Sequence, residues 1–217
     1  MIPPGSTGTG GGDKGGLAIP RGGTAGARRP LFFDPNLNIV FGVTLISVLG
    51  VASVTPAFPE MTRALGVNQE DAAWLISAFT IPGLLFTPLV GLLSDRFGRR
   101  RVLIPCLFLF GAAGGACFFA PGFGALMTFR FLQGIGSAPL NVLNAALIGD
   151  FFEGDDRPAA MGYNTSMIGV GTALYPALGG LLAMVGWNYP FLLSLLALPV
   201  GAWAYLGLEE GKRFPAG

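Results

Sequence analysis

Six long apolar runs, separated by short polar segments, make up most of this chain of 217 residues. A helix that crosses about 30 Å of hydrocarbon needs roughly 20 apolar residues, and each run is close to that length. The runs cover residues 37–57, 72–93, 102–119, 126–147, 159–185 and 191–208. The pattern predicts an all-α membrane protein in which residues 36–208 form one bundle of six transmembrane helices.

The composition supports a membrane protein and argues against several other classes. Only 12% of the residues are charged and 52% are apolar, whereas a soluble domain carries about a quarter of its residues as charges. The chain has no His, no metal-ligand spacing and no phosphate-binding glycine loop followed by Lys. We therefore expect no enzyme activity, no metal site and no cofactor. The net charge of +1 gives no reason to expect a nucleic-acid partner.

Nearly all of the 13 Lys and Arg residues fall on one side of the predicted spans. Those on this side are Lys14, Arg21, Arg28, Arg29, Arg96, Arg99, Arg100, Arg101, Arg157, Lys212 and Arg213. Arg63 is alone on the other side, and Arg130 lies within the fourth span. Because Lys and Arg are retained in the cytoplasm, both termini and the loops after the second and fourth spans are predicted to be cytoplasmic. We expect a multi-pass protein of the cytoplasmic (inner) membrane, surrounded by the lipid bilayer.

The first 35 residues differ from the rest of the chain. They are rich in Gly and show no apolar periodicity, so they cannot bury enough surface to offset the entropy of ordering. Residues 1–35 are therefore predicted to be a disordered cytoplasmic tail.

A charged segment, residues 91–101, connects the second and third spans, and we call it the hinge. Its four Arg residues require water, and the glycines allow a tight turn and close approach of the two helices. The segment resembles the loop between the second and third helices of major facilitator superfamily transporters. An ordinary positive-inside loop would explain the Arg residues but not the spacing of Gly and Asp. The residues that carry the resemblance are Gly91, Ser94, Asp95, Arg96, Gly98, Arg99 and Arg100.

The fourth span begins with Arg130 and resembles a second motif of the superfamily, Arg-x-x-Gln-Gly-x-Gly-x-Ala. A charge inside the membrane costs at least about 2.5 kcal/mol unless it faces a cavity or a partner. Arg130 is therefore a candidate for proton coupling or substrate binding, unless its side chain extends outward to the membrane surface. The resemblance also implies that Asp95, Arg99 and Asp150 form a charge relay that stabilises one conformation.

The fifth span resembles the antiporter motif of proton-coupled drug exporters, Gly-x8-Gly-x3-Gly-Pro-x2-Gly-Gly. The matching positions are Gly162, Gly171, Tyr175, Pro176, Gly179 and Gly180. Small residues on one face let helices cross closely, and the motif favours export over uptake. Tyr175 departs from the motif, which has Gly at that position, and this puts close packing in doubt there.

The resemblance implies one half of a major facilitator fold with both termini cytoplasmic. Family members bind substrate between two six-helix halves, so we expect a second half, in the same longer chain or from a second copy. Residues 209–217 are then a cytoplasmic tail or the start of the linker to that half. The predicted function is proton-coupled efflux of lipophilic drugs or metabolites by alternating access.

Polar residues within the spans suggest where a substrate or a proton could bind. Asn141 and Asn144 are three residues apart on the fourth span and are candidates for the substrate cavity. Asn164 on the fifth span either lines the cavity or forms hydrogen bonds between helices. No acid lies well inside a span, so the proton carrier is Asp95, Asp150 or a group on the second half.

Three other interpretations remain open. The chain could be a truncated or half-size membrane protein that does not transport alone and acts as an interaction partner. It could be an uptake carrier of the same superfamily. A six-helix channel is disfavoured because paired Asn-Pro-Ala motifs and a filter-like loop are missing from the sequence.

Overall fold

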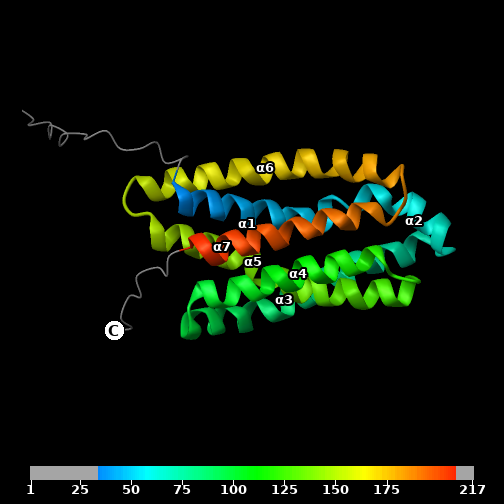
Figure 1. The fold of residues 1–217 in the computed structure, drawn as a ribbon, viewed down its shortest axis with the longest axis horizontal. Helices are drawn as coiled ribbons and strands as arrows, with labels where there is room; N and C mark the ends of the chain where they lie inside the picture. The colour runs from blue at the N-terminus through cyan, green and yellow to red at the C-terminus, as the bar shows by residue number, and fades with distance from the viewer. Residues whose placement is uncertain (1–33, 209–217) are drawn as a thin grey trace, which may run out of the picture.

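In the computed structural model of this protein, residues 34–208 are described, apart from the side chains of Gln69, Ala72 and Asn141. The predicted tail therefore lies outside the described residues up to position 33, and so does the whole C-terminal segment, residues 209–217. Within the described range the chain forms a bundle of long helices that run side by side (Figure 1).

The helices follow one another with short connections. They are α1 (Pro35–Ala52), the 3₁₀ helix η2 (Thr55–Ala57), α2 (Phe58–Leu65), α3 (Gln69–Phe97), α4 (Arg99–Phe118), α5 (Phe123–Phe151), α6 (Asp156–Ala183), the 3₁₀ helix η3 (Tyr189–Leu196) and α7 (Ala197–Gly207). They build six segments that are long and apolar enough to cross a membrane. This confirms the predicted all-α fold with six spans.

The first helix begins slightly earlier than predicted. Asp34 caps α1 by accepting hydrogen bonds from the backbone N–H groups of Asn36 (2.8 Å) and Leu37 (3.3 Å). Pro35 follows at the first helical position, where its missing N–H has no intrahelical partner to lose. Two residues of the predicted disordered tail are therefore part of an ordered helix start.

The hinge is almost entirely helical, which corrects the predicted loop. Only Gly98 separates α3 from α4, and its φ of 97° lies in a region that favours glycine. Its N–H donates to the carbonyl oxygen of Ser94 at 2.9 Å. Gly91 lies inside α3, where an added Cβ would meet nothing within 4 Å. Gly91 thus serves neither the turn nor a close helix contact. The turn lies at Gly98 because both helices continue beyond their apolar runs into the charged residues.

The centre of the bundle is formed by α1 and α5. Helix α1 packs against α5, α6 and α7, whereas α5 packs most extensively against α3 and α4. Val43 of α1, Leu107 of α4 and Leu140 of α5 are completely buried in the resulting apolar core. The described ends of the chain, Asp34 and Leu208, lie at the same end of the bundle as the turn between α3 and α4 (Figure 1). We call this the hinge end.

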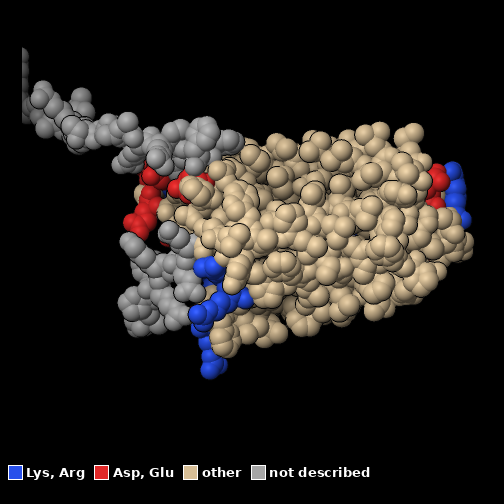
Figure 2. All heavy atoms as spheres, viewed as in Figure 1, with Lys and Arg blue, Asp and Glu red and all other residues tan. Residues whose placement is uncertain are grey.

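Helices α3 and α6 are the least buried of the six spans and expose many apolar side chains. Leu84 and Leu92 of α3 are 73% and 71% exposed, and Leu181 of α6 is 63% exposed. Charged side chains gather at the two ends of the bundle, and the face between them shows none in Figure 2. Lipid or another protein must cover such a large apolar surface.

Candidate functional site

The hinge end carries the predicted charge relay. Arg99 Nη1 lies 3.0 Å from Asp150 Oδ2, so the first turn of α4 is linked to the last turn of α5. Arg99 Nη1 has no hydrogen-bond partner among the described residues. The contact with Asp150 is therefore an ion pair without an aligned hydrogen bond. The charges of Asp95 and Arg157 also act on Asp150. Arg157 lies over Gly149, where an added Cβ would be 3.1 Å from Arg157 Nη2.

Asp95 is near this pair without joining it. Its side chain is exposed on α3, and within residues 34–208 no ion pair of Asp95 is present. The structure therefore brings two of the three predicted relay residues into contact and places the third close enough for an electrostatic effect. The relay role itself stays a prediction.

The remaining hinge residues have separate surroundings. Arg96 is exposed, and its guanidinium carbon lies 5.7 Å from the ring centre of Phe97. Arg100 donates a hydrogen bond to the backbone carbonyl of Tyr205 in the last turn of α7. Ser94 is buried, and its hydroxyl donates to the carbonyl oxygen of Gly91 at 2.7 Å.

Arg130 points into the bundle. Its side chain is 3% exposed, so the outward-extending alternative does not apply. Nη1 donates to the carbonyl oxygen of Gly50 in α1 at 2.8 Å and to Gln133 Oε1 at 3.0 Å. The guanidinium also lies 5.5 Å from the ring centre of Phe79 and 4.8 Å from that of Phe191. A carbonyl, an amide and two aromatic faces thus compensate the buried charge in place of an acid.

The Arg130 site continues into a network that joins three segments. Gln133 Nε2 donates to Ser194 Oγ of η3 at 2.9 Å. Gly114 of α4 allows this contact, because an added Cβ would lie 2.5 Å from Gln133 Nε2 and 2.3 Å from Ser194 Cβ. Arg130 Nε has no hydrogen-bond partner among the described residues. Sequence reasoning missed Ser194, although it is the only Ser or Thr in the last predicted span.

A second polar cluster, which we call the Thr44 cluster, lies between α1, α5 and α6. The Thr44 hydroxyl meets Asn164 Oδ1, and Asn144 Nδ2 donates to the Thr44 hydroxyl and, at 3.4 Å, to Asn164 Oδ1. Asn144 is 4% exposed, and its Oδ1 has no partner among the described residues. Here Asn144 and Asn164 connect helices; a role of Asn144 in substrate binding stays a prediction. The side chain of Asn141, the other candidate, is outside the described part of the structure.

The glycines of the predicted antiporter motif have unequal roles in α6. A Cβ on Gly179 would lie 1.9 Å from the carbonyl oxygen of Ser53, and one on Gly180 would lie 3.8 Å from Pro56 Cβ. Gly162 is surrounded by open space. Ser53 is the C-terminal cap of α1, so the motif forms a close contact between α6 and the end of α1 at Gly179 and none at Gly162.

The departure at Tyr175 does not disrupt this contact. Tyr175 is 6% exposed, and its ring lies 3.3 Å from the position that a Cβ on Gly171 would take. Pro176 follows inside α6, which remains continuous to Ala183. The absent side chain of Gly171 leaves the space that the Tyr175 ring needs.

The six apolar spans, the charged ends and the polar groups within the bundle define a multi-pass membrane protein. Residues 40–215 match the model of the Major Facilitator Superfamily, and the chain belongs to this family. The predicted resemblance is thereby confirmed, and the six apolar helices agree with the predicted multi-pass membrane location.

The curated relatives are named as exporters or as drug-resistance proteins. The chain is 35% identical to the bacillibactin exporter of Bacillus subtilis, with 72% of this chain and 40% of the relative covered. It is 32% identical to the multidrug resistance protein Stp of Mycobacterium tuberculosis (strain H37Rv), with 76% and 30% covered. It is 27% identical to the multidrug export protein EmrB of Haemophilus influenzae, with 78% and 34% covered. The chain thus spans less than half the length of these relatives.

Solved structures support the fold. The proton:xylose symporter XylE superposes with a TM-score of 0.72 at 18% identity, covering 83% of this chain and 45% of that one. A bacterial homologue of the human lysosomal transporter Spinster gives a TM-score of 0.65 at 19% identity, covering 82% and 44%. At these identities the likeness concerns the fold alone.

Proposed function

We propose that this protein is a secondary active exporter of lipophilic drugs or metabolites in the cytoplasmic membrane, coupled to protons. The observation that carries the proposal is the set of relatives, whose names describe export of bacillibactin or of multiple drugs. The close contact of α6 with α1 at Gly179 agrees with the antiporter-like motif. Transport follows alternating access, with substrate bound between two six-helix halves.

The second half packs against the exposed apolar faces of α3 and α6. These helices are the least buried of the six spans, at 22% each. The second half belongs to a longer form of this chain or to a second copy, since the relatives are more than twice as long as the matching segment. If neither form transports, the chain acts as an interaction partner within the membrane instead.

The ion pair at the hinge end stabilises one of the two alternating states. Arg99 and Asp150 hold α4 against α5 at their ends, and Asp95 adds a negative charge nearby. Separation of the two halves at this end would change the surroundings of all three charges. A partly exposed ion pair contributes only about 0–1 kcal/mol to stability. We therefore propose that the altered surroundings of the three charges, and not the free energy of the Arg99–Asp150 pair alone, shift the equilibrium between the two states.

An efflux assay tests the function. The natural gene product is expressed in bacteria that lack their own exporters, and retention of a lipophilic dye is measured with and without an ionophore that collapses the pH gradient. We expect dye retention to fall and the ionophore to restore it. Unchanged retention by a correctly inserted protein contradicts export, whereas export that the ionophore leaves intact contradicts only proton coupling.

Charge substitutions test the relay. We expect Asp95→Asn and Asp150→Asn to reduce export at least about tenfold while membrane insertion is unchanged. Glu60→Gln is the matched control, because Glu60 pairs with Arg63 at the opposite end of the bundle. Normal export by the Asp95→Asn variant would contradict the relay and leave the export assignment intact.

A further inference from the structure

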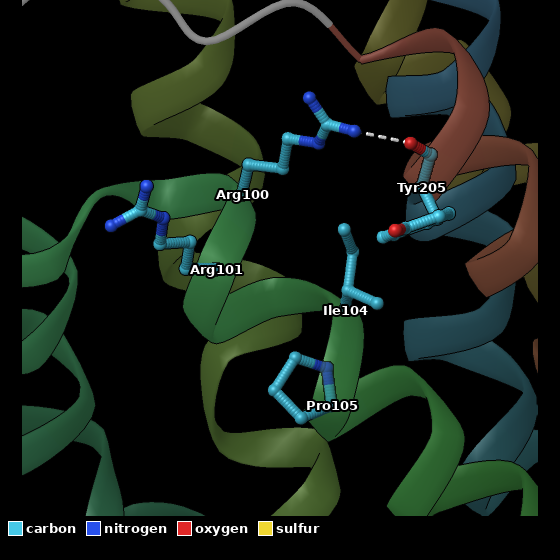
Figure 3. A pocket seen from close by; sticks show the side chains of 5 residues that line it. All are labelled: Arg100, Arg101, Ile104, Pro105 and Tyr205. Atoms are coloured by element: carbon cyan, nitrogen blue, oxygen red, sulfur yellow. Dashed lines mark hydrogen bonds between the residues drawn. The ribbon is translucent and has the colours of Figure 1, made fainter.

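A pocket opens at the hinge end between the start of α4 and the last turn of α7. It has a volume of about 410 Å³ and is lined by Arg100, Arg101, Ile104, Pro105 and Tyr205 (Figure 3). None of these lining residues is acidic. The pocket lies away from the Arg130 network and the Thr44 cluster, and the proposed transport cycle does not use it.

Arg100 supplies a fixed positive charge at this pocket. One of its N–H groups donates to the carbonyl oxygen of Tyr205, and its guanidinium carbon lies 5.6 Å from the Tyr205 ring centre. A guanidinium has five N–H donors, and in Figure 3 the other terminal nitrogen of Arg100 points away from Tyr205. The side chain is therefore held in place while donors remain for an anion. Two terminal N–H groups in one plane suit the oxygens of a phosphate.

The other part of the pocket is apolar and lies further along α4 from the hinge end. Ile104 is one helical turn beyond Arg100, about 6 Å further along the α4 axis, and Pro105 follows it. The apolar run of α4 begins at residue 102, just beyond the Arg residues, so this direction leads toward the hydrocarbon. Pro105 is exposed on the surface of α4, which leaves this side of the pocket open to the surroundings of the bundle.

We propose that this pocket binds the phosphate headgroup of an anionic phospholipid. The phosphate contacts the remaining N–H groups of Arg100, and the start of an acyl chain lies along Ile104 and Pro105. The order of groups is that of a lipid, with charge at the end of the helix and apolar side chains one turn deeper. A soluble phosphate would use only the charged part. The bound lipid would join the first turn of α4 to the last turn of α7, independently of which substrate the carrier moves.

Native mass spectrometry of the delipidated natural gene product in detergent tests this site. The probes are phosphatidylglycerol, diacylglycerol, which lacks the phosphate, and inorganic phosphate. We expect one tightly retained phosphatidylglycerol, at least about tenfold weaker retention of diacylglycerol, and no displacement by phosphate at equal concentration. Equal retention of diacylglycerol contradicts recognition of the phosphate. Displacement by inorganic phosphate contradicts a lipid as the ligand.

Matched variants locate the binding site. Arg100→Gln should weaken phosphatidylglycerol retention at least about tenfold. Arg96→Gln removes the same charge from the same end but outside the pocket, and should change retention less than about twofold. Equal losses in the two variants would show attraction to surface charge alone and overturn the site.

A second variant keeps the test valid if Arg100→Gln fails to fold. Ile104→Trp fills the apolar part of the pocket and leaves every charge in place. We expect it to weaken phosphatidylglycerol retention by a similar factor, with an unchanged elution volume in size-exclusion chromatography. Normal retention by this folded variant contradicts the proposed position of the acyl chain and overturns the site.

Discussion

The close contact between α6 and α1 allows a quantitative test with a single methyl group. A Cβ at position 179 would lie 1.9 Å from the carbonyl oxygen of Ser53, 2.7 Å from its carbonyl carbon and 3.0 Å from its Cα. These are backbone atoms of a residue that is completely buried, so no side-chain rotation can relieve the overlap. The Gly179→Ala variant must therefore move α6 away from α1 by roughly 1–2 Å, if the Cβ is to reach ordinary contact distance.

The expected size of the effect follows from two opposing contributions. Overpacking of a rigid contact costs about 1–3 kcal/mol, and a backbone clash belongs at the upper end of that range. Replacing Gly by Ala inside a helix returns about 1 kcal/mol. The net destabilisation of Gly179→Ala is then about 2 kcal/mol. For a chain of this size that corresponds to a decrease in Tm of roughly 4–8 °C.

Thermal unfolding in detergent, followed by tryptophan fluorescence, measures this difference. Gly162→Ala is the matched control, because it is the same substitution in the same helix at a position with open space. We expect its Tm to be unchanged or slightly raised, since only the helix-propensity gain applies. Equal Tm values for Gly179→Ala and the wild type would refute the close α1–α6 contact. An equal decrease in both variants would show that the contact with Ser53 is not the cause.

Two further predictions concern the buried polar groups. Arg130→Lys should lower Tm and reduce export at least about tenfold, because an ammonium cannot reproduce the planar contacts with two aromatic rings. The control is Arg63→Lys, at an exposed position, which should change neither Tm nor export. A fully active Arg130→Lys protein would argue against a role for the contacts with the rings. Thr44→Val should destabilise the bundle by about 0.6 kcal/mol, measured by unfolding, and a double-mutant cycle with Asn144→Leu should show coupling. The control is Thr165→Val, at an exposed hydroxyl. If the effects of Thr44→Val and Asn144→Leu on the free energy of unfolding simply add, the two side chains are not coupled and the cluster is contradicted.

The spans could be predicted from local sequence, whereas their ends could not. Helix α3 continues through the charged residues to Phe97, and α4 begins at Arg99, so the hinge loop predicted over residues 91–101 shrinks to Gly98. Hydropathy marks where a helix leaves the hydrocarbon, but the helix ends where its backbone hydrogen bonds end. Gly98, one of the glycines with positive φ, marks this end of α3, and Gly91 has no comparable requirement.

The sequence motifs predicted which residues belong to the candidate site, but not all of the groups that those residues contact. The motifs pointed to Arg99, Asp150 and Arg130, and the first two form an ion pair. They did not point to Gly50, whose carbonyl oxygen accepts from Arg130 across 80 positions of sequence. A backbone carbonyl carries no signal in the side-chain pattern, so such a partner is visible only once the helices are packed.

The sequence by itself determined that this chain crosses a membrane six times and belongs to a transporter family. Hydrocarbon imposes length and apolarity on each helix separately, and that requirement is readable segment by segment. Only the tertiary structure decided which polar groups meet, as when Asn144 reaches Thr44 across 100 positions. Such contacts depend on the rotation and crossing of whole helices. Rotation and crossing follow from where small residues such as Gly179 allow two backbones to touch.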